Sequence, residues 1–307
     1  APSLHQQPKP EVQDAVLFRG VGHGVFQSDQ LWMVYSGGAT HNRGDGGAFG
    51  LVAKLGETWE RLIHLEPSLD YFGSAYQSTY LINGVGQRTG LDTLIQRATY
   101  ERFGSGEGFH YAASNIRPLY ANPALSKLKR HVVMVRGKYV VLLDDLAGTE
   151  ALNFETRFQT AAANSVTVDG NGGRILGTQH DLHVVSSGFD PFTPGQGAGA
   201  AVRHLSFSRQ AQAATLLTVL YPTVKGGAAP TVSVANGVVT ISNGGETDQV
   251  TFIREGSDWR LSAVNGASAD GIPDGSERNV IPYRDGRDDT NEVPSGMLET
   301  VGNPTIT

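Results

Sequence analysis

Cysteine is absent from this chain of 307 residues, which excludes disulfide bonds and thiolate metal sites. Long apolar runs are also missing, and none approaches the roughly 18–20 residues that a membrane-spanning helix requires. Basic residues are in the minority, with 24 Lys and Arg against 30 Asp and Glu and a formal net charge of −6. Because nucleic-acid binding depends on clustered cations, this balance argues against a nucleic-acid partner.

Helical patterns are scarce as well. They are confined to 92–99, to 124–131 and to Gln6–Val16, where a short helix would start near Glu11. None of these segments is long enough to anchor a fold of alternating helices and strands. The chain opens at Ala1-Pro2-Ser3 without an initiator Met or an apolar signal core, so we expect a processed or trimmed terminus, and we expect a secreted or periplasmic protein.

Strand patterns fill most of the remaining sequence. Short apolar or alternating runs recur at spacings of roughly 8–12 residues, separated by Gly, Asn and Asp, which is typical of an antiparallel sandwich. The runs are 31–35, 50–55, 132–135, 139–143, 151–160, 165–168, 182–186, 202–208, 214–221, 231–234, 238–241, 249–254 and 259–264. We therefore predict an all-β fold, a large antiparallel two-sheet β-sandwich over 17–265 with few short helices. Residues 1–16 form an N-terminal extension in this interpretation, and 266–307 form a loop-rich segment.

Two of the turns are legible from their residues. Asn236-Gly237 lies between two apolar runs and suits a type I′ hairpin, and Arg136-Gly137 occupies the same position between 132–135 and 139–143. Both indicate antiparallel neighbours.

The densest polar chemistry lies in a glycine-rich stretch. Within five positions it holds a titratable group, an amide, a fixed cation and a fixed anion: His41, Asn42, Arg43 and Asp45. The flanking glycines tolerate the close approach of a ligand. We interpret the stretch as part of a sugar-binding cleft, with two bland alternatives: His41 bonded to backbone, and Asp45 capping its own turn.

Several segments, in order, resemble the β-sandwich domain of heparinase II/III-like polysaccharide lyases, the group that includes oligoalginate lyases. The segments are Thr40–Phe49, Trp59–Gly73, Ser78–Gln87, the hairpin Arg130–Asp145 and Leu216–Pro222. The resemblance implies β-elimination on a uronic acid in an acidic polysaccharide or oligosaccharide. It also implies a helical toroid, as a domain or a second chain, which this sequence does not contain.

The implied chemistry needs a group that neutralises the sugar carboxylate, a base for the C5 proton and an acid for the leaving oxygen. We assign catalysis to His41, Tyr76 and Arg43, with Tyr71 or Tyr80 as other phenols for the acid or base. Substrate binding falls to the remaining polar and aromatic residues nearby, namely Asn42, Tyr71, Gln77, Gln87 and Arg88. For Gln87 a turn amide is the alternative, and for Tyr71 plain packing.

The sequence contains no clear metal site. Arg43 and Gln77 stand where the family has histidines that bind zinc, and a guanidinium does not ligate a metal. His180 and His183 would point to opposite faces of a strand. The remaining possibilities are His64 with His41 and Asp70, and a calcium loop at Asp270–Asp274, which lacks the usual alternating ligands.

Two other functions stay open. The first is a non-catalytic glycan-binding or structural sandwich that has lost the lyase site. The second is a glycoside hydrolase, which needs two carboxylates about 5–10 Å apart. Candidates for that pair are Glu57, Glu60, Glu66 and Asp70.

Overall fold

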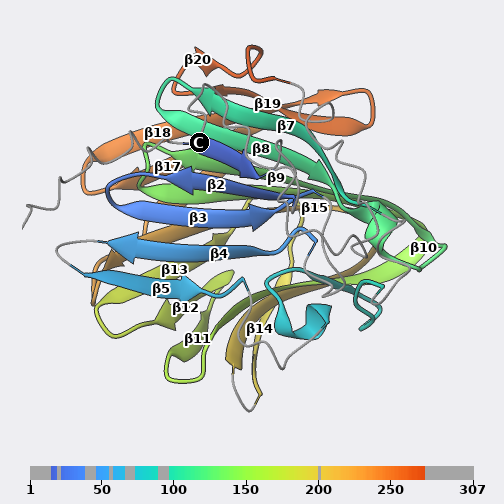
Figure 1. The fold of residues 1–307 in the computed structure, drawn as a ribbon, viewed down its shortest axis with the longest axis horizontal. Coiled ribbons are helices and arrows are strands. Elements are labelled where there is room, and N and C mark those ends of the chain that lie inside the picture. Colours follow the sequence, from blue (N-terminus) through green and yellow to red (C-terminus); the bar gives the residue numbers. More distant parts are fainter. Residues whose placement is uncertain are drawn as a thin grey trace, which may run out of the picture.

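The computed structural model describes residues 15–18, 22–38, 46–54, 58–65, 73–88, 97–199 and 202–273. This part of the chain contains three antiparallel sheets (Figure 1). The first sheet runs in the order β1 (Ala15–Phe18), β2 (His23–Gln27), β3 (Leu31–Ser36), β4 (Phe49–Lys54), β5 (Trp59–Ile63). The third sheet consists of β16 (Thr231–Ala235), β17 (Val238–Asn243), β18 (Glu246–Glu255), β19 (Asp258–Val264) and β20 (Ala267–Ser268).

The central sheet lies between these two. Its strands are β6 (Tyr80–Ile82), β7 (Thr99–Gly106), β8 (Phe109–Asn115), β9 (Leu125–Val135), β10 (Tyr139–Ala161), β11 (Ser165–Asp169), β12 (Gly172–Leu176), β13 (His180–Ser186), β14 (Thr193–Ala198) and β15 (Val202–Val224). The order is β11-β12-β13-β15-β10-β9-β8-β7, with β14 on β15 and β6 on β10. Two short 3₁₀ helices, η1 (Ser74–Tyr76) and η3 (Arg117–Leu119), complete the described elements.

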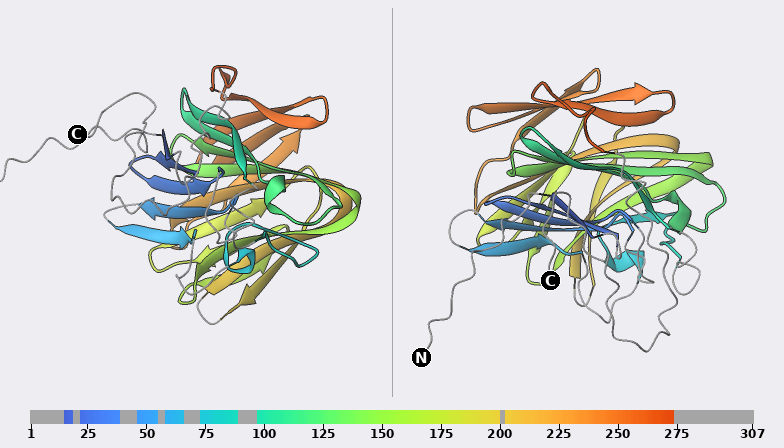
Figure 2. Two further views of the ribbon diagram at one scale, coloured as in Figure 1. Left: turned by 45° about the vertical axis from the view of Figure 1, so that its right-hand side comes forward. Right: turned by 45° about the horizontal axis from the view of Figure 1, so that its top comes forward.

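The prediction of an all-β antiparallel fold is confirmed, and the structure adds a third layer to the two that were expected. Figure 2 shows the blue first sheet on one side of the green and yellow central sheet and the orange third sheet on the other. In β10, Val140 and Leu142 pack into a core shared with the first sheet. Val141 and Leu143 pack into a second core shared with the third sheet. Every position of this run is apolar because both faces of the strand are covered.

Two 23-residue strands, β10 and β15, pair along most of their length at the centre of the molecule. Each was predicted as two shorter strands. The continuation of β10 past Asp144 and Asp145 is possible because both side chains have ion-pair partners. A shift in register beyond Ala147 allows the strand to bend.

The prediction of a helix over 124–131 is wrong, because this segment belongs to β9 and pairs with both β8 and β10. Leu125 and Leu128 are three residues apart, which imitates a helical period. Both reach the same core because β9 carries a bulge between them: Lys127 pairs with Ala147 and Leu125 with Gly148, so Ser126 is an extra residue. Both hairpins are confirmed, and Asn236 and Gly237 have the positive φ values that a type I′ turn requires. Arg136 and Gly137 also have positive φ.

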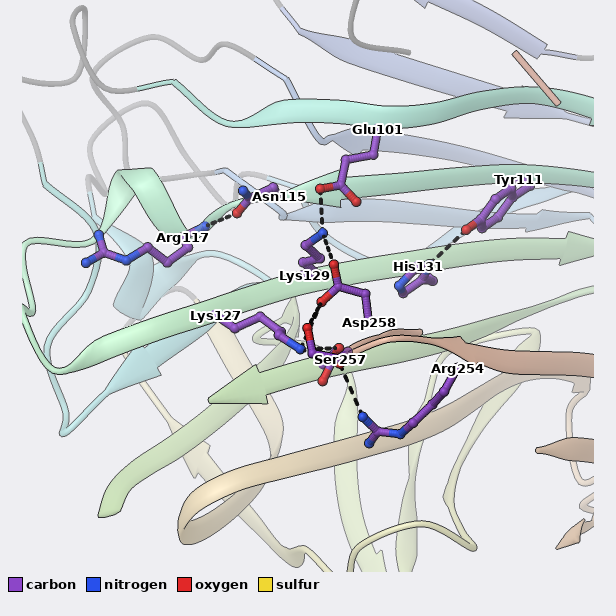
Figure 3. A network of polar contacts seen from close by, with 11 residues as sticks. Glu101, Tyr111, Asn115, Arg117, Lys127, Lys129, His131, Arg254, Ser257 and Asp258 are labelled. Carbon is purple, nitrogen blue, oxygen red and sulfur yellow. Dashed lines mark hydrogen bonds and ion pairs between the residues drawn. The ribbon is translucent and has the colours of Figure 1, made fainter. Parts of the chain in front are cut away.

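A charged cluster ties the third sheet to the central one (Figure 3). Lys129 Nζ lies 2.7 Å from Glu101 and 2.9 Å from Asp258, and Lys127 Nζ lies 3.0 Å from Asp258 and 3.1 Å from Asp145. The hydrogen bond from Lys129 lowers the pKa of Asp258 to about 2.

The described residues contain no helix of the length and apolarity that crossing a membrane requires.

Candidate functional site

The segment 39–45, which carries the polar cluster of the sequence, is anchored at both of its ends. Ser36 N donates to Ala48 O at 2.8 Å and Gly47 N donates to Ser36 O at 2.6 Å, so the chain leaves β3 and re-enters before β4 at one place. Gly38 N donates to Gly22 O at 3.0 Å. His41, Asn42, Arg43 and Asp45 themselves lie outside the described residues.

Buried side chains hold the two ends of the 39–45 segment, one from each side. The hydroxyl of Tyr100 accepts from Gly37 N at 3.0 Å and lies 2.7 Å from Tyr35 O. On the other side, Gly46 N donates to Gln87 Oε1 at 2.9 Å and Gly46 O accepts from Gln87 Nε2 at 2.5 Å. Thr79 Oγ1 also donates to Gly46 O, at 2.8 Å. The base of the polar segment therefore lies against the 73–88 stretch that carries the other predicted site residues.

Gln87 is 7% exposed, and its amide is engaged within the protein. Besides Gly46, its Nε2 lies 3.2 Å from the hydroxyl of Tyr120, which in turn donates to Tyr80 O at 2.8 Å. Of the two interpretations of Gln87, this geometry supports the turn amide over the sugar contact. The residue braces one segment against another, and we assign it that positioning role.

Replacing Gln87 with Leu is expected to lower the free energy of unfolding by about 1–3 kcal/mol, because the buried N–H and C=O of Gly46 lose their amide partner. Urea-induced unfolding measures the change. Gln210→Leu, at an exposed position of β15, is the matched control and should stay within about 0.5 kcal/mol of the parent. Equal losses in the two variants would contradict the bracing role.

A buried ion pair lies beneath both segments. Arg130 on β9 donates from Nε to Asp144 Oδ1 at 2.7 Å and from Nη2 to Asp144 Oδ2 at 3.0 Å. Its Nη1 donates to Gly47 O at 2.7 Å and lies 3.5 Å from Ser78 O, and Nη2 also bonds Thr156 Oγ1 at 3.1 Å. Burial opposes the charge of Arg130, yet the carboxylate of Asp144 outweighs it and raises the pKa of the guanidinium. One cation thus fixes the backbone on both sides of the candidate site.

Tyr80 does not serve as an acid or base. Its ring is 0% exposed and its hydroxyl donates to Asp144 Oδ2 at 3.0 Å. Burial, followed by the charge of Asp144, raises the pKa of the phenol well above its usual value. The residue belongs to the ion-pair scaffold, and the sequence interpretation that offered it as a catalytic phenol is wrong.

Tyr76 is the predicted catalytic phenol that reaches the surface, with 37% of its area exposed at the end of η1. This 3₁₀ helix is held beside the brace because Ser74 Oγ accepts from Gln87 N at 2.9 Å. Tyr71, the other candidate, lies outside the described residues. Tyr76, Gln87 and the base of the 39–45 segment are therefore contiguous through Ser74 and Gly46.

Gln77 follows Tyr76 and is buried, with no hydrogen-bond partner for either amide atom among the described residues. Nearby, Gln159 bonds Ala75 O through Nε2 while its Oε1 is also without a partner there. Arg88 is half-buried, with a buried Nε that likewise lacks one in the described part of the chain. The orphaned atoms of Gln77 and Gln159 lie beside η1, where a polar ligand would satisfy them.

The described residues do not assemble a zinc site. His64 is half-buried, and burial followed by the charge of Arg61 lowers its pKa to about 4. Its Nδ1 has no described partner, but His41 and Asp70 lie outside the described residues and Gln77 offers an amide. Within the described ranges, no three His, Cys, Asp or Glu side chains come together as a metal site.

The other candidates have structural partners. His180 bonds Glu60 on β5 at 2.9 Å, whereas His183 lies 3.1 Å from Gly227 O, so the two rings face opposite sides of β13 as alternation predicts. Glu60 also accepts from the backbone N–H groups of Thr178, Gln179 and His180, and these bonds outweigh burial and lower its pKa. Glu60 is therefore a strand anchor.

The other carboxylates offered for a hydrolase pair, Glu57, Glu66 and Asp70, lie outside the described residues. Asp270, from the suggested calcium loop, accepts from Arg260 Nη1 at 2.5 Å, and Asp274 is not described.

Comparison with known proteins identifies the fold. No protein-family model and no curated protein matches the chain. The structure is similar to heparan sulfate lyase HepC from Pedobacter heparinus, with a TM-score of 0.63 at 15% identity over 83% of this chain and 43% of that one. It is also similar to heparinase III, with a TM-score of 0.58 at 16% identity over 78% of this chain and 42% of the other.

A further heparinase III structure aligns with a TM-score of 0.56 at 14% identity, over 76% of this chain and 41% of that one. The chain has the fold of the β-rich part of heparinase-like polysaccharide lyases, and it spans less than half the length of these structures.

Sequence reasoning missed the residues that build the site's frame. Arg130 lies two residues before the apolar run 132–135 and Asp144 directly follows the apolar run 139–143, and opposite charges at the ends of two paired apolar runs were the available signal for a buried ion pair.

Proposed function

We propose that this chain is, or is part of, a polysaccharide lyase that cleaves a uronic-acid-containing polysaccharide by β-elimination. The observation that carries the proposal is the fold shared with heparan sulfate lyase HepC over 83% of this chain. The arrangement around Gly46 and η1 supports it. Exposed Tyr76 lies close to Gly46, where the segment that bears His41 and Arg43 is anchored.

In the proposed reaction a base takes the C5 proton of the uronate. The electron pair of the C5–H bond forms the C4=C5 double bond, the C4–O4 bond breaks, and O4 receives a proton from an acid. Arg43 and Asn42 pair with the C6 carboxylate and so acidify the C5 proton. His41 and Tyr76 act as base and acid, and Tyr71, Gln77 and Arg88 contact the sugars. The protein is secreted or periplasmic in this proposal, and a helical toroid domain or chain completes the cleft.

The second candidate function is a non-catalytic glycan-binding sandwich. Gln77, which holds an amide where the lyases have a histidine, favours it. A hydrolase has less support, because Glu60 is engaged by three backbone N–H groups and His180.

Ultraviolet absorbance during incubation with alginate, hyaluronan or heparan sulfate separates these functions, since elimination creates a conjugated unsaturated uronide. A rise in absorbance on one polymer is the expected result. Binding without the rise supports the second function, and new reducing ends without the rise indicate hydrolysis. Either outcome overturns the lyase proposal.

Replacing His41 with Ala is expected to lower kcat on that polymer by about 100-fold or more, because a positioned proton-transfer group is lost. Tyr76→Phe, which removes only the hydroxyl, should give a loss of similar size. His110→Ala serves as control, since His110 lies on β8 and bonds Ser105 at 2.8 Å. Unchanged activity of His41→Ala on every uronate polymer would remove His41 from the mechanism.

A further inference from the structure

A pocket of about 380 Å³ opens at the β11–β13 end of the central sheet, within the size range of small-molecule sites. Residues of β12 and β13 line its floor, and Gly227–Ala229, in the connection from β15 to β16, form a wall. Gly46 and η1 line no part of it. The candidate lyase site therefore leaves this pocket unexplained.

Three polar side chains lie in a row across the strands here. Thr167 on β11 pairs with Arg174 on β12, and Arg174 pairs with His183 on β13, so all three project from the same face. The neighbouring pair, Ile175 and Leu182, belongs to the core shared with the first sheet. The row thus faces away from the first sheet, on the side where the third sheet covers other strands.

Arg174 lines the pocket without a partner for its charge. Its Nε is buried and unbonded, and no ion pair or hydrogen bond of its guanidinium occurs among the described residues. The hydroxyl of Thr167 is also buried and unbonded there. Burying unpaired donors costs free energy, which a bound anion would recover through charge-assisted hydrogen bonds.

His183 supplies a fixed acceptor beside this cation. Its Nε2 lies 3.1 Å from the carbonyl oxygen of Gly227, and a carbonyl only accepts, so Nε2 carries the proton. In the neutral ring Nδ1 is then left as an acceptor. Asp169 and Asn171 also line the pocket and add oxygen and amide groups of the kind that bind sugar hydroxyls.

We propose that this pocket is a second glycan site, in which Arg174 binds the carboxylate of a uronic acid residue while Asp169, Asn171 and His183 bind its hydroxyls. The choice of an acidic saccharide as the ligand rests on the proposed function. The observation that Arg174 has no partner for its charge among the described residues is independent of it. The pocket holds a non-reacting part of the polymer, away from the bond that is cleaved.

The test is titration of the full chain with a uronic acid hexasaccharide, followed by the backbone amide resonances of glycines. Gly172, Gly173 and Gly227 report the pocket, and Gly46 and Gly47 report the candidate lyase site. We expect saturable shifts at the pocket glycines, and at least about a tenfold weaker affinity there in Arg174→Gln, since one charge-assisted pair is lost. The matched neutral hexasaccharide should shift the pocket glycines far less.

Arg203→Gln is the control, because Arg203 lies on β15 and its Nε bonds Ala162 O at 3.0 Å outside the pocket. An unchanged affinity in Arg174→Gln, or no shift at the three pocket glycines, overturns the inference. Pocket shifts without any unsaturated product would overturn the lyase proposal and leave the glycan site standing. Formation of unsaturated product without shifts at the pocket glycines would overturn the glycan site and leave the lyase proposal standing.

Discussion

Replacing Asp144 with Asn is expected to lower the free energy of unfolding by about 3–5 kcal/mol. Arg130 is 0% exposed, so the substitution leaves a guanidinium charge buried without its counter-charge. Arg130→Met should cost a comparable amount, because Asp144 is equally buried and the carbonyl of Gly47 loses its donor. Urea unfolding monitored by tryptophan fluorescence measures both.

The double variant Arg130→Met/Asp144→Leu should recover a large share of the loss, since a buried ion pair replaced by apolar residues of similar volume is often close to neutral. Lys138→Met, which breaks the exposed pair with Glu246, is the control and should cost about 1 kcal/mol or less. A single-variant loss no larger than that control would contradict the scaffold role.

The same variants also test whether the Arg130–Asp144 ion pair supports the proposed chemistry. Arg130 holds the carbonyl of Gly47, at the end of the 39–45 segment, and Tyr80 joins the next segment to Asp144. Loss of the pair therefore loosens two segments that must keep their relative position for a reaction. A misplacement near 1 Å lowers rates by about 100-fold, so activity should fall even under conditions where the protein stays folded.

Local pattern in the sequence was sufficient for many of the strands and for both hairpins. Asn236-Gly237 has the positive φ values that its residues suggest, and β4 and β19 lie within a residue of their predicted bounds. The same reasoning did not detect charged side chains that are neutralised by residues of a neighbouring strand. The strand β10 passes through Asp144 and Asp145 because Arg130 and Lys127 neutralise them from the next strand, and that pairing depends on register.

The third layer had a signal that pattern reasoning did not use. A two-sheet sandwich covers one face of each strand and predicts alternation of apolar and polar residues, whereas Tyr139–Leu143 is apolar throughout. Such a run in an antiparallel sheet indicates cover on both faces. The functional sites show the same contrast between local pattern and long-range pairing. The sequence pattern identified Tyr76 and Gln77, whereas the pocket beside Arg174 depends on the pairing register across three strands.

The buried ring of His131 makes a second large effect expected, in the dependence of stability on pH. The ring lies between the central and third sheets, with Nδ1 2.8 Å from the Tyr111 hydroxyl and Phe252 edge-on at 6.1 Å (Figure 3). Burial, followed by the charge of Lys129 and against that of Asp258, lowers its pKa from 6.5 to about 3. The folded protein therefore keeps this ring neutral where the unfolded chain binds a proton.

The stability that the neutral ring contributes is present above pH 6.5 and is lost as the pH falls from there towards 3. One such group changes the free energy of unfolding by about 1.4 kcal/mol for each pH unit in that window. His131→Leu should reduce the slope by that amount between pH 6 and pH 4.5, whatever its stability at neutral pH. His64, whose pKa is also lowered by burial, keeps its own share of the slope in the variant.

Phe252→Leu is the matched control, because it removes packing from the same interface without a titrating group. We expect it to lower stability by a similar amount at every pH and to leave the slope unchanged. Urea unfolding at half-unit intervals of pH distinguishes the two variants. An unaltered slope in His131→Leu would mean that the ring is protonated in the folded state, and its burial without a counter-charge would then have to be relieved by movement of the third sheet.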